Sequence, residues 1–374
     1  MPLFLHTADW QIGRQYGQFA PDDAAAIAEA RIDAVTTLAR LATEHRVDAV
    51  LVAGDVFDAQ TVSDRTILRL FNAMRAFDGP WVLIPGNHDA ALGESVWTRA
   101  RRLDAVPDTV RLSLVPEAIE FAALGFAVLT APLTQRHTHH DLTAWFDGAE
   151  TAPGLLRIGL GHGAVQGILA PDIDSANPIA PDRASLARLD YLGLGDWHGR
   201  KQIDARTWYS GTPEADRFRG NDPGWVLRVA IDAPGAVPVV TPLQTGRYRW
   251  SQWEQPIEVA SDAEALIGRL ATLDDRDVLQ LSLSGRCDLE TLARLQAAVS
   301  RAGAAARSLQ ADLGALRLQP SAADVTALAA DGYLGEVIAE LRDLQAGAQA
   351  DAASRGLAIL SGLLGERRDA KAAA

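Results

Sequence analysis

The chain has 374 residues, of which 48% are hydrophobic, and its formal net charge at pH 7 is −13. This is enough apolar material for a large core, and the length exceeds that of one average domain. The charge disfavours a general electrostatic attraction to nucleic acid, although metal ions and a few arginines could still dominate one cleft. The single cysteine, Cys287, excludes an intramolecular disulfide bond.

Two features of the sequence indicate where the protein works. The N-terminal stretch MPLFLHTAD lacks the basic and apolar regions of a signal peptide, and no apolar run approaches the roughly 20 residues of a membrane span. We therefore expect a soluble, cytoplasmic protein. The presence of only one cysteine also favours a location in a reducing compartment.

The first half of the chain alternates short apolar runs with helical patterns. Strands are expected at 2–9, 47–55 and 81–89, with helices between them at 22–45 and 63–77. This β-α-β-α-β order predicts a layered α/β sheet flanked by helices. Further strands follow with shorter connections and are expected at 126–133, 157–163, 191–196, 208–211 and 224–231.

A break in the pattern falls near Thr241 to Trp253, and we place a domain boundary there. Beyond it, the apolar patterns predict a smaller α+β unit and then two amphipathic helices, the second around Leu357 to Leu364. An apolar stripe with little chain after it suits docking on a partner helix, and packing on its own domain is the alternative. The expected divisions are 1–245, a capping domain at 246–320, and a C-terminal, partner-binding segment at 321–374.

Five short segments share one feature, which is an apolar strand that ends in side chains able to bind metal. Strand ends in an α/β sheet face a common crevice, and a preceding Gly lets the backbone turn sharply. Each segment alone is more often a turn, a helix cap or a structural histidine, but the ordered set indicates a metal-dependent phosphoesterase. The segments are Asp9-Trp10-Gln11, Gly54-Asp55-Val56-Phe57-Asp58, Gly86-Asn87-His88-Asp89, Gly161-His162-Gly163 and Gly195-Asp196-Trp197-His198.

The order of these motifs resembles that of the calcineurin-like metallophosphoesterases. The stretches HTADWQIG, GDVFD and YSGTPE narrow the resemblance to the SbcD-type DNA repair exonucleases, and it covers about Met1 to Ile231 well. It implies a layered metallophosphoesterase β-sandwich flanked by helices. It also implies exonuclease or endonuclease activity on DNA, in DNA repair, with an SbcC-type coiled-coil ATPase as partner. A homodimer is left open.

The roles of the metal ligands carry over from the family by their positions in the motifs. Asp9 and His198 match ligands of a first metal ion, and Asp55 matches the carboxylate that bridges two ions. Asn87 and His162 match ligands of the second ion. The resemblance therefore implies two divalent ions, which would activate a water molecule and hold the phosphate for in-line attack.

The remaining motif positions include two departures from the family pattern. His88 matches the histidine that protonates the leaving oxygen, and Asp89 would orient it. Gln11 stands where the family has a histidine, and Asp196 stands where it has the first histidine of the last motif. A neutral amide oxygen binds metal more weakly than imidazole, whereas a carboxylate is a hard anionic donor. We expect both to bind metal, the first ion to be the looser, and Mn²⁺ to be preferred, with Mg²⁺ or Fe²⁺ as alternatives.

Basic residues near the expected cleft are candidates for holding phosphate, while RHTHHD at 136–141 is interpreted as a solvated loop. Two further functions stay open. One is a small-molecule phosphodiesterase or phosphatase of the same superfamily, which the net charge favours slightly. The other is a non-catalytic scaffold, for which only Gln11 argues. The phosphate candidates are Arg200, Lys201, Arg217 and Arg219.

Overall fold

The computed structural model describes residues 2–168, 176–319, 333–357 and 359–360. The chain divides into two compact units, Met1–Tyr248 and Arg249–Ala374. The division lies close to the boundary expected after residue 245. The separate segment at 321–374 stays a prediction, since part of it lies outside the described residues. Within the described ranges, no helix is both long and apolar enough to cross a membrane.

Two six-stranded sheets form the first unit, with strand orders β14-β13-β1-β2-β3-β4 and β11-β12-β10-β7-β6-β5. The strands of the first sheet are β1 (Leu3–Thr7), β2 (Ala49–Ala53), β3 (Trp81–Ile84), β4 (Val110–Leu112), β13 (Trp225–Ala230) and β14 (Val239–Gln244). Those of the second are β5 (Glu117–Phe121), β6 (Phe126–Ala131), β7 (Leu156–His162), β10 (Tyr191–Gly195), β11 (Lys201–Gln202) and β12 (Thr207–Tyr209). A small pair, β8 (Ala164–Val165) and β9 (Pro178–Ile179), lies apart from both sheets.

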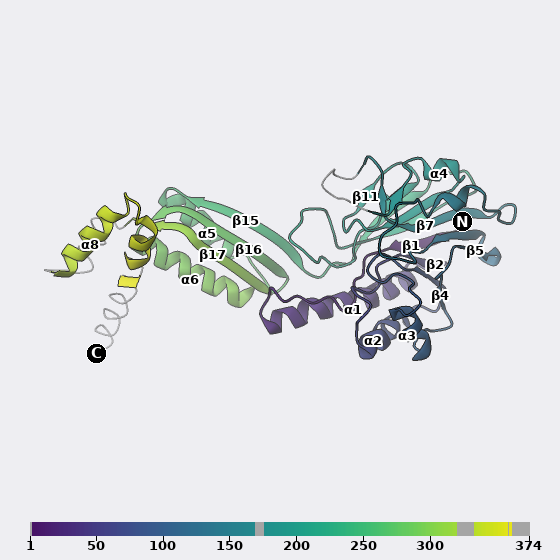
Figure 1. Cartoon of the computed structure of the whole chain (residues 1–374), viewed down its shortest axis with the longest axis horizontal. Coiled ribbons are helices and arrows are strands. Elements are labelled where there is room, and N and C mark those ends of the chain that lie inside the picture. Colours follow the sequence, from purple (N-terminus) through teal and green to yellow (C-terminus); the bar gives the residue numbers. More distant parts are fainter. Residues whose placement is uncertain (1, 169–175, 320–332, 358, 361–374) are drawn as a thin grey trace. The chain divides into compact units, whose positions relative to one another are not determined.

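Alternation along the strands packs the two sheets face to face. In β1, Phe4 points into the core between the sheets, whereas its neighbour Leu5 packs with the helices on the outer face. Phe126 and Ile158 supply the same inner core from the second sheet. Figure 1 shows α1, α2 and α3 together on one side of the strands of the first sheet. The expected layered α/β sandwich flanked by helices is confirmed.

The helices of the first unit begin where the sequence offers start signals. The helix α1 has Pro at its first position, where no backbone N–H is needed, and Ser63 caps α2 by accepting a hydrogen bond from Thr66 N. The helices are α1 (Pro21–Glu44), α2 (Asp64–Met74), α3 (Val96–Arg102) and α4 (Arg183–Leu186), with 3₁₀ turns η1 (Ala122–Leu124) and η2 (Ala144–Asp147).

Parallel pairing brings the functional segments to one edge of each sheet. In the first sheet β1, β2 and β3 are parallel, and in the second β6, β7 and β10 are parallel. All of these strands therefore end on the same side of their sheet, where the predicted motifs lie. Hydrogen bonds connect the two sheets there. Among them, His162 Nδ1 donates to Ala53 O (2.8 Å), and Asp196 N donates to Asp9 Oδ1 (3.0 Å).

The second unit is a three-stranded parallel sheet of order β15-β16-β17, covered by α5 and α6. A strand runs through part of the expected break, since β15 begins at Arg249. Trp253 of this strand packs on the apolar cluster beneath the helices, with the guanidinium of Arg269 4.0 Å from its ring centroid. This unit contains β15 (Arg249–Ile257), α5 (Ala260–Leu270), β16 (Asp277–Cys287), α6 (Leu289–Ala305), β17 (Ser308–Leu318) and α8 (Tyr333–Leu344).

The described part of the C-terminal segment packs within the second unit. Ile338 of α8 and Leu357 are almost fully buried, and they form a small cluster with Leu318 at the end of β17. Ile359 is 65% exposed. Leu363 and Leu364 of the predicted apolar stripe lie outside the described residues, so docking of this segment on a partner stays a prediction.

One buried guanidinium holds together two distant segments of the first unit. Arg31 of α1 is 2% exposed and donates to the carbonyl oxygens of Trp10 (2.7 Å), Asp9 (2.9 Å) and Glu214 (3.1 Å). It also donates to Thr212 Oγ1 at 2.9 Å. Arg31 therefore ties the turn after β1 to the YSGTPE stretch, and its planar fork of donors can satisfy several acceptors at once.

Replacing Arg31 should destabilise the protein strongly. Arg31→Met leaves the buried carbonyl groups of Trp10 and Asp9 without their described donor, whereas Glu214 O still accepts from Thr212 Oγ1 (2.9 Å). Each orphaned group costs about 1–3 kcal/mol, so we expect the free energy of unfolding to fall by about 2 kcal/mol or more. Arg40→Met, on the exposed side of the same helix, removes a surface ion pair with Glu44. This change should lower the free energy of unfolding by about 0.5 kcal/mol or less. Urea unfolding of both variants tests this. Equal effects would contradict the role of Arg31.

Candidate metal centre

Four residues of the predicted motifs hold a backbone conformation with positive φ. The angle φ is 55° at Asp9, 43° at Gln11, 52° at Asp55 and 100° at Asp196. Residues other than Gly rarely take this conformation, and each case costs of order 1 kcal/mol or more. Half of the eight described non-Gly residues with positive φ are thus at this one place. The surrounding structure maintains the strain, and the four side chains turn into a common site.

Two glycines make room for the ligands that follow them. Gly54 has φ of 88°, and a Cβ atom there would collide with the His162 ring. A Cβ atom on Gly86 would collide with the side chain of Asp55. The Gly at the start of each of these two motifs therefore has two roles. It allows the sharp turn that the sequence predicts, and its lack of a side chain lets a predicted ligand from another motif pack against the backbone.

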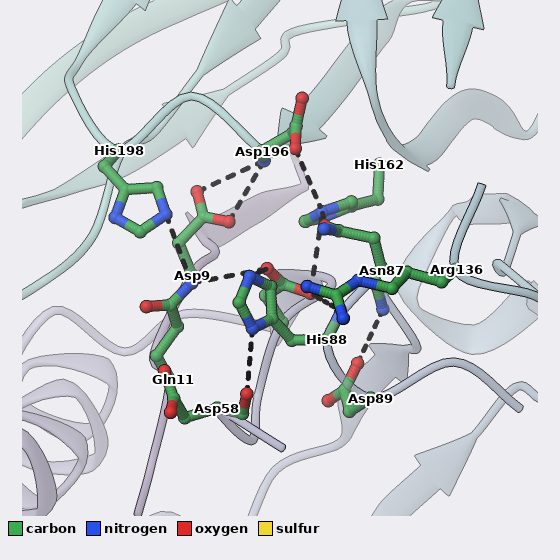
Figure 2. Close-up of polar contacts among 12 residues, drawn as sticks. Asp9, Gln11, Asp58, Asn87, His88, Asp89, Arg136, His162, Asp196 and His198 are labelled. Atoms are coloured by element: carbon green, nitrogen blue, oxygen red, sulfur yellow. Dashed lines mark hydrogen bonds and ion pairs between the residues drawn. The ribbon is translucent and has the colours of Figure 1, made fainter. Parts of the chain in front are cut away.

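Three side-chain oxygen atoms that could bind a metal ion surround one nitrogen of His162. Its Nε2 atom lies 2.9 Å from Asn87 Oδ1, 3.6 Å from Asp55 Oδ1 and 3.7 Å from Asp196 Oδ1. Nδ1 donates to the Ala53 carbonyl, which leaves Nε2 as the nitrogen that faces the site. Figure 2 shows Asn87, His162 and Asp196 converging from different elements. Four donors of this kind can hold a divalent cation, and we call this place the second position.

The charges at the site fit a cation. Asp9, Asp55 and His162 are buried and offer ligand atoms within 4.8 Å of one another. Burial raises the pKa of Asp9 to about 6 and that of Asp89 to about 7. Burial alone would lower the pKa of His162, but the carboxylates of Asp55 and Asp9 raise it to about 9. The buried carboxyl groups therefore need a nearby positive charge to ionise near neutral pH. A divalent ion would supply this charge, and its binding would release their protons.

The other expected ligands form a neighbouring place, which we call the first position. His198 Nδ1 lies 3.1 Å from Asp216 Oδ2 and 2.8 Å from Arg217 Nη2, and Arg217 Nη2 also lies 3.2 Å from His198 Nε2. Gln11 is 1% exposed, and its amide nitrogen lies 3.3 Å from His198 Nε2 and 3.5 Å from Asp55 Oδ2. As Figure 2 shows, Gln11 lies on the same side of the site as Asp9 and His198. Coordination through its amide oxygen stays a prediction.

His88 faces the same place without being held by Asp89. Its Nδ1 atom donates to the carbonyl oxygen of Asp58 at 2.8 Å, and its Nε2 atom lies 4.0 Å from Asp55 Oδ2. The carboxylate of Asp89 instead accepts hydrogen bonds from the backbone N–H groups of Phe57 (3.0 Å) and Gly86 (2.7 Å). The expected role of Asp89 in orienting His88 is therefore wrong. Asp89 joins two motif turns, since its short side chain satisfies buried donors on both.

A cavity of about 220 Å³ is lined by four of the predicted metal ligands, Asp55, Asn87, Asp196 and His198. Of the four predicted phosphate-binding residues, Arg217 and Arg219 line it, but Arg200 and Lys201 do not. Arg200 pairs with Asp222 at 2.7 Å and lies over the Trp225 ring. The other lining residues include ligands and neighbours of the motifs, namely Asp55, Asn87, His88, His137, Ala176, Asn177, Asp196, Trp197, His198 and Asn221.

Several residues that support the site carry no motif signal. Arg14 donates to Gln11 Oε1 at 2.7 Å, and Asp216 supports His198. Burial alone would raise the pKa of Asp216, but the charges of His198 and Arg31 hold it well below its usual range. The side chains of Arg14 and Asp216 come from opposite ends of the first unit's sequence, yet they lie 3.4 Å apart. Only the fold therefore reveals their part in the site.

The raised pKa values predict how stability depends on pH when divalent ions are removed with EDTA. The neutral form of Asp9 stabilises the fold below its unfolded pKa of 3.8, and this is lost as pH rises through about 6. Protonated His162 stabilises it below pH 6.5, and this is lost as pH rises through about 9. We therefore expect the urea concentration at the midpoint of unfolding, measured in EDTA, to fall from pH 5 to pH 8. The midpoint of the Asp9→Asn variant should fall less over the same pH range. Mn²⁺ should restore stability at pH 8, and a flat profile in EDTA would contradict the charge assignment.

Comparisons with known proteins bear on the first unit. Residues 2–168 match the family described as calcineurin-like phosphoesterase. An uncharacterized metallophosphoesterase, YhaO of Bacillus subtilis strain 168, is 28% identical over 239 residues, which are 60% of this chain and 56% of that relative. The crystal structure of TT1561 of Thermus thermophilus aligns with a TM-score of 0.42 and 12% identity, over 65% of this chain and 99% of that one. Residues 2–168 are therefore similar to the calcineurin-like phosphoesterases, and the buried group of Asp9, Asp55 and His162 is consistent with a metal-binding site in this part of the chain.

Proposed function

We propose that the protein is a two-metal phosphodiesterase that cleaves DNA, as an exonuclease or endonuclease in DNA repair, with Mn²⁺ as its preferred ion. The observation that carries the phosphodiesterase part is the second position, where His162 and three oxygen donors meet beside His88 under an open cavity. The DNA substrate rests on the resemblance of HTADWQIG, GDVFD and YSGTPE to SbcD-type nucleases. Three oxygens and one imidazole form a hard ligand set, which suits Mn²⁺ or Mg²⁺.

The chain's own residues can divide the work of the reaction. The metal ions supply an activated water molecule and a clamp for the phosphate when bound. Asp58 holds the His88 ring by its Nδ1 atom, so Nε2 can give a proton to the leaving oxygen. Arg219 on the cavity wall can pair with the phosphate oxygens, and Arg217 can do so by exchanging its ion pair with Asp216 (2.9 Å) for the substrate. His88 is half-buried, which lets it reach a substrate and still keeps its orientation.

A small-molecule phosphodiesterase is the second candidate. The net charge of −13 opposes a long DNA track, and the cavity of about 220 Å³ is small. Incubation of the protein and Mn²⁺ with linear double-stranded DNA, beside bis(p-nitrophenyl) phosphate, separates the two. Release of nucleotides from DNA supports the nuclease. Cleavage of the small ester alone supports the second candidate, and no cleavage of either supports a scaffold.

His88→Ala should reduce turnover by at least about 10²-fold, because it removes the proton donor but no metal ligand. Bound Mn²⁺, measured by elemental analysis after gel filtration, should stay near that of the unchanged protein. His139→Ala is the control, since His139 is exposed and does not line the cavity. If His88→Ala lost metal in proportion to activity, His88 would be a ligand and its assignment would fail.

We also propose that an SbcC-type ATPase binds the C-terminal segment. Leu357 and Leu360 both pack within their own unit, so the proposal rests on the remainder of the apolar stripe that the sequence predicts, Leu363 and Leu364. Removing residues 361–374 should abolish co-purification with such an ATPase and spare cleavage of short DNA. A truncated protein that still forms the complex would refute this docking site.

A further inference from the structure

Arg14 determines which end of the Gln11 amide faces the metal site. Its Nη1 atom donates to Gln11 Oε1 at 2.7 Å, so the amide oxygen points away from the metal ligands. The amide nitrogen points toward His198 Nε2 (3.3 Å) and Asp55 Oδ2 (3.5 Å). An NH₂ group has no lone pair for a cation, and at the first position it stands where a ligand oxygen is needed.

The backbone gives Gln11 little freedom to change this. Its N–H donates to Asp55 O at 2.8 Å, and the N–H of Ile12 donates to Val56 O at 2.9 Å. The residue is 1% exposed and already holds φ of 43°. Rotation of the side chain is therefore the available route by which the amide oxygen can reach the first position.

Rotation is opposed by the anchoring of Arg14. Its guanidinium lies 3.5 Å from Asp58 Oδ1 and 3.4 Å from Asp216 Oδ2, with 26% of the side chain exposed. If the amide turned over, its NH₂ group would face these N–H donors, and a charge-assisted hydrogen bond would be lost. Such a bond contributes enough to change an equilibrium constant by about tenfold or more.

We propose that Arg14 keeps the first metal position closed in the resting protein, and that a cation binds there only after the Gln11 amide turns away from Arg14. The second position has no such restraint, because its donors already face one another. Arg217 Nη2 also lies 3.2 Å from His198 Nε2, but Arg14 is the residue that turns the Gln11 amide oxygen away from the site. The inference rests on the proposed two-metal function, but it concerns metal binding and not the substrate.

Titration with Mn²⁺, followed by electron paramagnetic resonance of the free ion, tests the proposal without measuring catalysis. The unchanged protein should show one tight and one weak site. Arg14→Met should tighten the weak site by about tenfold or more and leave the tight site within about threefold. Arg219→Met is the control, because it also removes one positive charge near the site, from the wall of the cavity, and Arg219 has no described hydrogen bond to Gln11. Equal effects of the two variants would show that charge alone is responsible, and the proposal would fail.

A double-mutant cycle separates the hydrogen bond from other effects of Arg14. Gln11→His should tighten the weak site, and adding Arg14→Met to it should bring no further gain, since the amide is gone. A full second gain from Arg14→Met in the Gln11→His background would overturn the proposal. An unchanged tight site in each variant shows that the variant is folded. Two Mn²⁺ sites that respond to Arg14 in a protein without phosphodiesterase activity would support this inference and refute the proposed function.

Discussion

Carboxylates with too little compensating charge lie at the centre of this protein, and much of the first unit serves to hold them there. Asp9, Asp55 and Asp89 are at most 1% exposed and lie beyond the ends of neighbouring strands. Within the protein, His162 and the backbone N–H groups of the motif turns balance only part of their charge, and the pKa values of Asp9 and Asp89 are raised. Buried like charges cost free energy unless a cation joins them, and the site is thus built for a divalent ion.

Holding the acids in place also requires unfavourable backbone conformations. Asp9 and Asp55 both have positive φ, and their turns are joined by a hydrogen bond from Asp9 N to Gly54 O (3.0 Å). Arg31 binds the carbonyl groups on one of these turns and on the Thr212–Glu214 stretch. The core around the site offsets this strain and holds the predicted ligands in place.

The two departures from the family pattern have different structural consequences. Asp196 joins the oxygen donors around His162, so its carboxylate replaces an imidazole without leaving the site. Gln11 also stays in place, but its amide presents nitrogen because Arg14 takes the oxygen. The difference follows from the surroundings of the two residues. Asp196 contacts Asp9 through its backbone N–H, and its carboxylate faces His162. The Gln11 side chain instead lies beside the guanidinium of Arg14, which binds its oxygen.

Local pattern in the sequence was sufficient for the central strands of both sheets and for α1 and α2, but it did not indicate the edge strands β4, β5, β11 and β14. It also marked the strand ends whose polar side chains the structure brings together. Short-range forces explain this, since apolar periodicity, helix caps and the turn after a parallel strand depend on neighbours in the chain. Other features needed the tertiary structure. Strand β15 begins in a stretch that reads as a break, and Asp89 binds backbone groups in place of His88. Arg14, Arg31 and Asp216 act through partners that folding brings near, and the direction of the Gln11 amide depends on such a contact, so no local pattern reveals it.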